Sequence, residues 1–571
     1  MASPLDAHTG GHVLMDANGE LGSDGGLPRR DFLKLGGAGL ATAAVAGTSC
    51  TPAVRDAAAP GDAWWVGASF ELEEMSIAQL VGTVAGGQRT SAEIIRLYLE
   101  RIQALDRAGP GLHSLIDINP DALEIAEGLD RERARGSVRG PLHGVPIVVK
   151  DNIDTADGMT TTAGSYALEG HIAARDSSVA EKLRAAGAII LAKANLSEWA
   201  NFRSTRSSSG WSGRGGQCGN AFAIDRNPCG SSSGSAAATS ANFCAAAIGT
   251  ETNGSIICPA SLNGVVGLKP TVGLVSRAGI IPIAHTQDTA GPVTRSVADA
   301  ALLLTVLAGA DPRDAMTAPA AGVAGIDYTS FLDADGLRGA RIGVERSFFG
   351  ADPTVDGLME EAIGIMASAG ATIVDEALLT TRTRIGLPAG RVLRYEFKAD
   401  IAAYLEAAGR PNGMATLADL IAFNAANADR EMPYFGQEIF EECVELGGLD
   451  SPEYLEAKET ARRLSRDEGI DALMERHQLD AIVSPAARHA WKTDLLNGSV
   501  GSAGSSGPAA IAGYPSITVP NGYVSGLPVG ILFFGSAWSE GTLLRLAYGY
   551  EQASQHRRPA RLAPTMDPRG A

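Results

Sequence analysis

The sequence lacks the patterns by which metal sites are usually recognised. Its six cysteines form no C-x-x-C pair, its nine histidines are scattered, and no H-E-x-x-H motif occurs. Zinc ligands recur at short, fixed spacings, so these absences argue against a zinc site. We therefore expect neither a metal ion nor a cofactor.

Positive charge is scarce as well. The 571 residues include 47 lysines and arginines against 65 aspartates and glutamates, which gives a formal net charge of −18. Proteins that bind nucleic acid concentrate lysine and arginine to contact the phosphates, so nucleic acid is not an expected partner. The acidity indicates a soluble protein, and the 45% of apolar residues are enough for a large core.

The apolar run at residues 35–49 is too short to span a bilayer permanently. It directly follows Arg29-Arg30-Asp31-Phe32-Leu33-Lys34, which has the pattern of a twin-arginine export signal. We therefore expect the twin-arginine export machinery to deliver the chain to the periplasm or the medium, with cleavage after Ala57-Ala58-Ala59. Two alternatives stay open: translation that starts at Met15, and a lipid anchor on Cys50, although the residues before this cysteine make a poor lipobox.

Residues 1–59 are interpreted as a disordered start with the export signal, and residues 60–571 as one domain, monomeric or homodimeric. Helical and strand patterns alternate along this domain, which predicts an α/β fold, and Thr90-x-x-Glu93 predicts a helix that begins with a capping box. The stretch at about 380–446 lacks the alternation and predicts a helical excursion. Strands are predicted at residues 145–149, 188–192, 272–283, 341–344, 371–374, 480–484, 516–519 and 529–534, an irregular loop at 288–295, and a helix at 540–554.

The stretch from Asp225 to Pro270 carries the most informative motifs of the chain. Two serine turns, Gly230-Ser231-Ser232-Ser233-Gly234 and Asn253-Gly254-Ser255, bracket an apolar segment, Ser235 to Ile248, with the composition of a buried helix. Such a helix would point its positive dipole end at the first turn, and backbone N–H groups of the second turn could converge on one point. A rigid serine beside convergent N–H donors offers a nucleophile and an oxyanion hole, as acyl transfer requires. A flexible linker is disfavoured, since apolar runs flank both turns.

Three further features near these turns allow more than one interpretation. Lys150 ends the apolar strand 145–149, and without the serine turns a surface Lys–Asp pair would be the default. Gly230–Gly234 matches G-x-S-x-G, the nucleophile elbow of α/β-hydrolases, with Ser232 at its centre, but Pro228 interrupts the strand that an elbow should follow. A disulfide is conceivable in this region, although buried free thiols are the favoured interpretation of Cys218, Cys229 and Cys258.

Three segments resemble the amidase signature family: HGVPIVVKDN around Lys150, CGSSSGSA around Ser231, and GTETNGSIICPASLNGVVGLKPT around Ser255. The resemblance runs over about residues 72–558, and the motif sequences are most similar to those of the bacterial peptide amidases. It implies a single domain built on a large mixed, twisted β-sheet with helices on both faces.

The resemblance also implies a Ser-cisSer-Lys triad, in which Ser255 is the nucleophile, Ser231 the bridging serine after a cis peptide bond, and Lys150 the base. Lysine acts as a base only when it is neutral, and burial can lower its ordinary pKa of ~10.4 by ~3–5 units. The oxyanion hole would be formed by the backbone N–H groups of Thr252, Asn253, Gly254 and Ser255.

This sequence departs from the family's usual pattern at three positions. Glu251 stands where an aspartate is usual, Asn253 where a second glycine is usual, and Ile257 where an arginine is usual. The changes at Glu251 and Asn253 bear on the substrate subgroup, and not on whether catalysis occurs.

The implied activity is hydrolysis of a carboxamide to a carboxylate and ammonia through an acyl-enzyme, with the C-terminal amide of peptides as the expected substrate. Export argues against the glutaminyl-tRNA amidotransferase subunit of the same family, which works in the cytosol. Three alternatives stay open: the same triad acting on fatty-acid, aryl or cyclic amides, a Ser232-centred α/β-hydrolase, and a non-catalytic exported binding protein.

Overall fold

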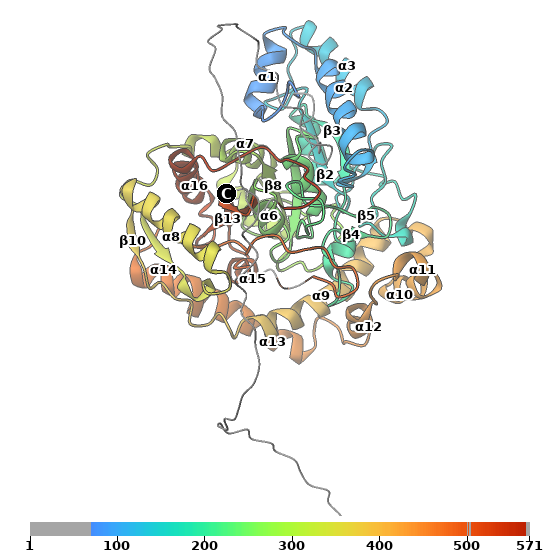
Figure 1. The fold of residues 1–571 in the computed structure, drawn as a ribbon. Helices are drawn as coiled ribbons and strands as arrows, with labels where there is room; N and C mark the ends of the chain where they lie inside the picture. The colour runs from blue at the N-terminus through green and yellow to red at the C-terminus, as the bar shows by residue number, and fades with distance from the viewer. Residues whose placement is uncertain (1–69, 500, 502–503, 567–571) are drawn as a thin grey trace, which may run out of the picture. The chain divides into compact units, whose positions relative to one another are not determined.

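The computed structural model describes residues 70–499, 501 and 504–566, which belong to one compact unit, Ala59–Ala571 (Figure 1). The predicted disordered start and export signal at 1–59, with Met15 and Cys50, lie outside the described residues. None of the described helices is both long and apolar enough to cross a membrane.

One large sheet forms the centre of the unit. Its strands are β1 (Leu115–Ile118), β2 (Pro146–Lys150), β3 (Ile189–Ala194), β6 (Ala246–Glu251), β7 (Val266–Lys269), β8 (Thr289–Thr294), β9 (Arg341–Val344), β10 (Thr372–Val374), β11 (Ala481–Pro485), β12 (Ser516–Val524) and β13 (Leu527–Phe534). Their spatial order is β1-β3-β2-β6-β8-β7-β12-β13-β11-β9-β10. β2 is parallel to β3 and β6, and β9 is parallel to β10 and β11, whereas the other pairs are antiparallel. The predicted single α/β domain with a mixed sheet is confirmed. A separate pair is formed by β4 (Trp211–Ser212) and β5 (Gly216–Gln217).

Helices connect these strands, and some of them begin at a residue whose side chain caps the first turn. Thr90 and Glu93 form the predicted capping box, because each side chain accepts a hydrogen bond from the other residue's backbone N–H. Among the described residues the α-helices are α1 (Ile77–Ala85), α2 (Ser91–Ile102), α3 (Ala122–Ala134), α4 (Ser178–Ala185), α5 (Ser233–Ser240), α6 (Ile257–Leu262), α7 (Val297–Leu307), α8 (Pro353–Ser368), α9 (Gly386–Ala407), α10 (Leu417–Ala426), α11 (Ala428–Glu431), α12 (Glu438–Val444), α13 (Pro452–Ser465), α14 (Asp471–His477), α15 (Gly507–Ala512) and α16 (Glu540–Ser554).

The composition of the apolar segment between the serine turns predicted one buried helix, and this prediction was wrong. Helix α5 ends at Ser240, Asn242 takes a left-handed conformation with φ of 59°, and the chain then enters strand β6. Every residue of α5 and of β6 is buried. A strand covered on both faces is as continuously apolar as a buried helix, so hydrophobic periodicity could not separate the two.

Two other local predictions were wrong. Residues 289–294 form strand β8 between β6 and β7, and the glycine and proline within it had indicated a loop. Pro292 lies opposite Ile248 of β6, whereas β7 pairs only with Val293 and Thr294, so the missing N–H of this proline faces no partner on β7. Residues 272–283 form no regular strand and make only isolated bridges.

Helices α9 to α12 occupy the stretch predicted as a helical excursion, and they gather on one side of the unit (Figure 1). They have a core of their own, in which Phe397 of α9 stacks on Phe440 of α12 with 5.1 Å between the ring centroids. Trp199 and Ile283, from loops that follow β3 and precede β8, pack into the same core. The excursion is therefore anchored to segments that lead to the end of the sheet where the serine turns lie.

Candidate active site

The topology brings the predicted base and both serine turns to one edge of the sheet. β2 and β6 are parallel neighbours, with Val149 opposite Ile248, so the carboxyl ends of both strands meet at this edge. Lys150 is the last residue of β2, and the turn with Ser255 follows the end of β6. This edge of an open α/β sheet is where ligands usually bind.

The side chain of Lys150 is completely buried and makes a defined set of contacts. Its Nζ lies 2.7 Å from Ser231 Oγ, 2.9 Å from Thr250 Oγ1 and 3.3 Å from the Thr250 carbonyl oxygen. Burial lowers the pKa of Lys150 to about 7, and the negative charges of Asp288 and Glu251 oppose this effect. At neutral pH a large fraction of this lysine is therefore an uncharged amine, the form that can accept a proton.

Ser231 follows a cis peptide bond from Gly230. Its side chain is buried, and its backbone carbonyl accepts a hydrogen bond from the N–H of Ser197 over 3.1 Å. The structure thus brings Ser231 and Lys150 together, as the sequence predicts.

Ser255 belongs to the second turn, which contacts the first through the backbone. Its carbonyl oxygen accepts a hydrogen bond from the N–H of Ser232 over 3.0 Å, so residue 255 lies directly beside the Ser231 segment. Gly254 has φ of 82°, a left-handed conformation that glycine adopts without strain. The described part of the chain gives no hydrogen bond between the Ser255 hydroxyl and Ser231.

The carboxylate of Glu251 fixes the shape of this turn. One of its oxygens accepts from the N–H of Gly254 over 2.8 Å, and the other accepts from the N–H groups of Ile256 and Ile257 over 2.7 and 3.0 Å. The N–H of Gly254, one of four predicted oxyanion donors, is therefore occupied. Within the described residues, the other three donate to no protein group: Thr252, Asn253 and Ser255.

Ser232 has the environment of a structural residue. Its hydroxyl donates to the carbonyl of Thr250 over 3.0 Å, accepts from the Thr250 N–H over 3.2 Å, and is fully buried. Both hydrogen-bonding roles of the hydroxyl are thus used by β6. This arrangement argues against the α/β-hydrolase alternative, which needs an exposed serine at the centre of the elbow.

Sequence reasoning missed Thr250, which contacts the lysine, and Asn152, which contacts Thr250. Thr250 Oγ1 accepts from Lys150 and also from Asn152 Nδ2, the latter over 3.1 Å. Thr250 is the last residue but one of the buried strand β6, and a polar residue at such a position was the available signal for it.

A cavity of about 410 Å³ opens beside the two turns. Gly230, Asn253 and Gly254 line it on the side of the serine turns. The rest of its wall includes polar side chains and one large aromatic: Asn201, Ser209, Ser499, Ser506 and Trp491. This is a binding volume of the size that small ligands occupy, and it lies next to the candidate catalytic groups.

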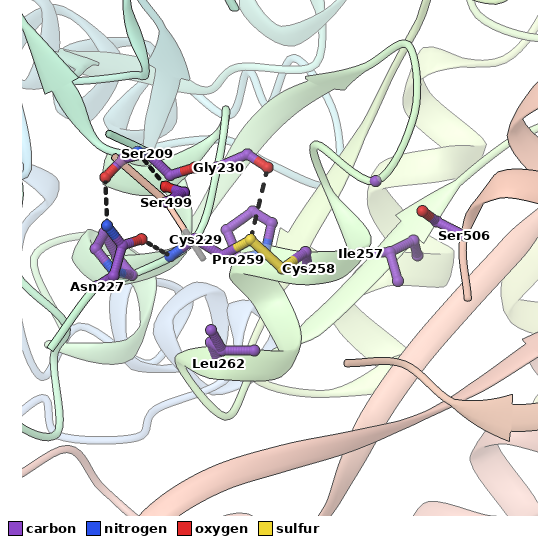
Figure 2. The surroundings of a disulfide bond; sticks show 12 residues. Ser209, Asn227, Cys229, Gly230, Ile257, Cys258, Pro259, Leu262, Ser499 and Ser506 are labelled. Carbon is purple, nitrogen blue, oxygen red and sulfur yellow. Dashed lines mark hydrogen bonds between the residues drawn. A yellow bond between two sulfur atoms is a disulfide. The ribbon is translucent and has the colours of Figure 1, made fainter. Parts of the chain in front are cut away.

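A disulfide bond joins Cys229 to Cys258 and lines the same cavity (Figure 2). Cys229 directly precedes Gly230, and its N–H donates to the side chain of Asn227 over 2.8 Å. Cys258 lies in the first turn of α6, three residues after Ser255, and its N–H donates to the carbonyl of Gly254 over 2.9 Å. The disulfide therefore links the two serine turns covalently.

The favoured interpretation of the cysteines near the turns was wrong for this pair. It holds for Cys218, which is a buried free thiol, as are Cys244 and Cys443. The two half-cystines are 29 residues apart, and no spacing rule distinguishes such a pair, because the turns approach each other only in the folded sheet.

Comparison with known proteins gives consistent results. Residues 93–544 match the protein family described as Amidase. A probable amidase of Arabidopsis thaliana is 41% identical over 500 residues, which cover 86% of this chain and 92% of that protein. The native peptide amidase of Stenotrophomonas maltophilia is 49% identical with a TM-score of 0.82, and a peptide amidase in complex with the competitive inhibitor chymostatin is 50% identical with a TM-score of 0.84. Each of these two alignments covers 86% of this chain and 99% of the other.

The matched region includes the buried lysine, both serine turns and the cavity beside them. It also covers every strand of the large sheet on which these features are built. The chain therefore belongs to the amidase signature family and is an enzyme that hydrolyses amides.

Proposed function

We propose that this enzyme hydrolyses the C-terminal carboxamide of peptides, with Ser255 as nucleophile, Ser231 as proton relay and Lys150 as base. The observation that carries the proposal is the 2.7 Å contact between Lys150 Nζ and Ser231 Oγ in a fully buried site. A buried lysine with a pKa of about 7 can exchange a proton at neutral pH, which is the property required of a general base.

In the first half of the reaction, Ser255 Oγ attacks the amide carbonyl carbon. Its proton moves to Ser231 Oγ while the proton of Ser231 moves to the lone pair of Lys150 Nζ. The ammonium form of Lys150 donates to Ser231 Oγ and to two acceptors on Thr250. The neutral amine keeps two hydrogens for the acceptors on Thr250, and its lone pair can then accept the proton of Ser231. The developing negative charge on the carbonyl oxygen is stabilised by free backbone N–H groups of the second turn.

When the C–N bond breaks, the proton held by Lys150 returns through Ser231 to the leaving nitrogen, and ammonia departs. The acyl group remains on Ser255 as an ester. Water then attacks this ester with the same relay as base, Ser255 regains its proton, and the carboxylate product is released.

Two observations support a peptide amide as substrate over the other amides. The similar proteins of known structure, at 49–50% identity, are described as peptide amidases. Polar side chains, among them Asn201, Ser209 and Ser499, line the cavity and suit the N–H and C=O groups of a peptide backbone. A fatty acyl chain would require a predominantly apolar channel.

The test is the release of ammonia from a C-terminally amidated dipeptide, compared with a fatty-acid amide and an anilide. We expect the highest kcat/KM for the dipeptide amide and no activity in Ser255→Ala. Preference for another amide would overturn the substrate but keep the triad, whereas full activity of Ser255→Ala would overturn the triad. A lack of ammonia release from every amide would favour a non-catalytic binding protein.

Export through the twin-arginine route is part of the same proposal. Disulfides persist in oxidising compartments and are rare in the cytosol, so the Cys229–Cys258 bond supports an exported protein. Cell fractionation of the wild type and of the double substitution Arg29→Lys, Arg30→Lys tests this. Retention of the double variant in the cytoplasm is expected, and equal export of both proteins would contradict the proposal.

A further inference from the structure

Asp288 stands directly opposite Thr252 because of the register of two central strands. In the antiparallel pair β6–β8, Thr250 lies opposite Ala290 and Glu251 lies opposite Thr289. The next position in this register pairs Thr252, the first residue after β6, with Asp288, the last residue before β8. An acidic side chain is thereby placed at the base of the turn that carries Ser255.

Both oxygens of the buried Asp288 carboxylate accept hydrogen bonds. One oxygen accepts from the hydroxyl of Thr252. The other accepts from the backbone N–H groups of Ile283 and Ala284 over 2.7 and 2.9 Å. The carboxylate therefore ties the loop before β8 to the start of the second serine turn.

Two other charged groups take part in the electrostatics of this carboxylate. The charge of Asp288 acts on Lys150 at the end of β2, as does that of Glu251 at the end of β6, and Arg277, from the loop that precedes β8, acts on Asp288. Arg277 pairs directly with Asp314, and its charge also lowers the pKa of Asp288. Of the two carboxylates that act on Lys150, Asp288 has the larger effect. Burial raises the pKa of Asp288 itself to about 6, so it is an anion at the pH where the lysine exchanges its proton.

We propose that Asp288 is a positioning residue for the amidase reaction, whose carboxylate holds Thr252 and the turn with Ser255. This inference rests on the proposed function, because it takes Ser255 as the nucleophile and Lys150 as the base. The negative charge of Asp288 also acts on the lysine and favours its ammonium form. This effect implies that Asp288 stabilises the proton on the lysine during acyl transfer and limits how readily the resting enzyme is deprotonated.

The substitution Asp288→Asn separates the charge from the hydrogen bonds. The asparagine oxygen can accept from Ile283 and Ala284, and its amide can donate to the Thr252 hydroxyl, which can act as an acceptor. We expect a folded variant whose acidic limb in the pH profile of kcat/KM moves by about 0.5–1 unit to lower pH, because the lysine loses an anionic neighbour. The matched control is Asp299→Asn, which removes another buried carboxylate, hydrogen-bonded to Ile77, outside this site and should leave the limb in place.

A second pair of variants tests the hydrogen bond without altering the charge. Thr252→Val removes the hydroxyl at nearly constant volume and should lower kcat about 10-fold or more, whereas Thr252→Ser keeps the hydroxyl and should recover most of that loss. Coincident pH profiles of wild type and Asp288→Asn would overturn the charge effect. Equal kcat in the valine and serine variants would overturn the positioning role. Failure of the proposed function gives a different result, namely activity in Lys150→Met and Ser255→Ala.

Discussion

The amino nitrogen of Lys150 meets the hydroxyl of Ser231 at 2.7 Å, although the two residues are 81 positions apart in the chain. Parallel pairing of β2 with β6 and the backbone contact between the serine turns together create this proximity. The base is thus fully buried, where water does not compete for its hydrogen bonds.

The pH dependence of catalysis should report the state of Lys150. Below its pKa of about 7 the lysine is protonated and cannot accept a proton from Ser231. We therefore expect kcat/KM to fall as the pH decreases below about 7, measured as ammonia release with a peptide amide at saturating and limiting concentrations. A rate that is independent of pH between 5 and 8 would contradict the role of base.

Removal of the amine should abolish turnover without unfolding the protein. Lys150→Met keeps an unbranched apolar stem and should lower kcat by about 10²–10⁴, the usual contribution of a general base. Lys269→Met is the matched control, because Lys269 is also fully buried but donates to the carbonyls of Pro270 and Tyr514. This control should lose stability and retain the wild-type pH profile.

The two candidate nucleophiles can be separated by alanine substitution. Ser255→Ala should eliminate the acyl-enzyme, detected as a mass increase with a slowly deacylating substrate. Ser232→Ala should remain able to form it, and should lose about 1–3 kcal/mol of stability because two buried hydrogen bonds to Thr250 disappear. The reverse outcome, with Ser232→Ala inert and Lys150→Met active, would support the α/β-hydrolase mechanism.

The disulfide should stabilise the enzyme. Replacement of Cys229 and Cys258 by alanine should lower the free energy of unfolding by about 2–4 kcal/mol, because the bond closes a loop between residues 29 positions apart. Cys218→Ala serves as the control for loss of a buried sulfur without loss of a cross-link. Thermal melting with and without reductant measures the effect, and identical melting of the oxidised and reduced wild type would contradict it.

His285, which contacts Asp400 of helix α9, should make the stability of the protein depend on pH. The hydrogen bond to Asp400, together with the charge of Glu396, raises the pKa of His285, whereas burial and Lys458 lower it. A raised pKa in the folded state means that the contribution is complete below the histidine's ordinary pKa and is lost as the pH rises through the folded-state value. His285→Gln should therefore lower the melting temperature more at pH 6 than at pH 9, and an equal loss at both would contradict this.

Local signals allowed much of the fold to be predicted from the sequence. Strand β9 and helix α16 have the predicted bounds, and the capping box at Thr90 is confirmed. Such features depend on neighbouring residues and need no tertiary information. Strand β8 was not predicted, because its conformation depends on tertiary structure. Its pairing with β6 overrides the preference of Gly291 and Pro292 for a turn.

The candidate site was predictable only in part. Lys150 and Ser231 could be identified because their surrounding motifs are long, and the structure places them together. The contacts that hold the site were not predictable: Glu251 occupies the N–H of Gly254, and Asp288 reaches Thr252 across a strand pair. Glutamate, aspartate and threonine occur at many kinds of position in proteins, so their presence in the sequence does not reveal their partners. Only the register of the sheet decides which of these side chains come into contact.

The Cys229–Cys258 bond also bears on when the enzyme matures. The cytosol keeps thiols reduced, so under the proposed export a chain still in the cytosol would have its two serine turns without their covalent link. If the link is needed for full activity, the newly made enzyme is latent at its site of synthesis and becomes competent after it enters an oxidising space. The cell's own amides would then be spared by the chemistry of the compartment, with no separate inhibitor or propeptide.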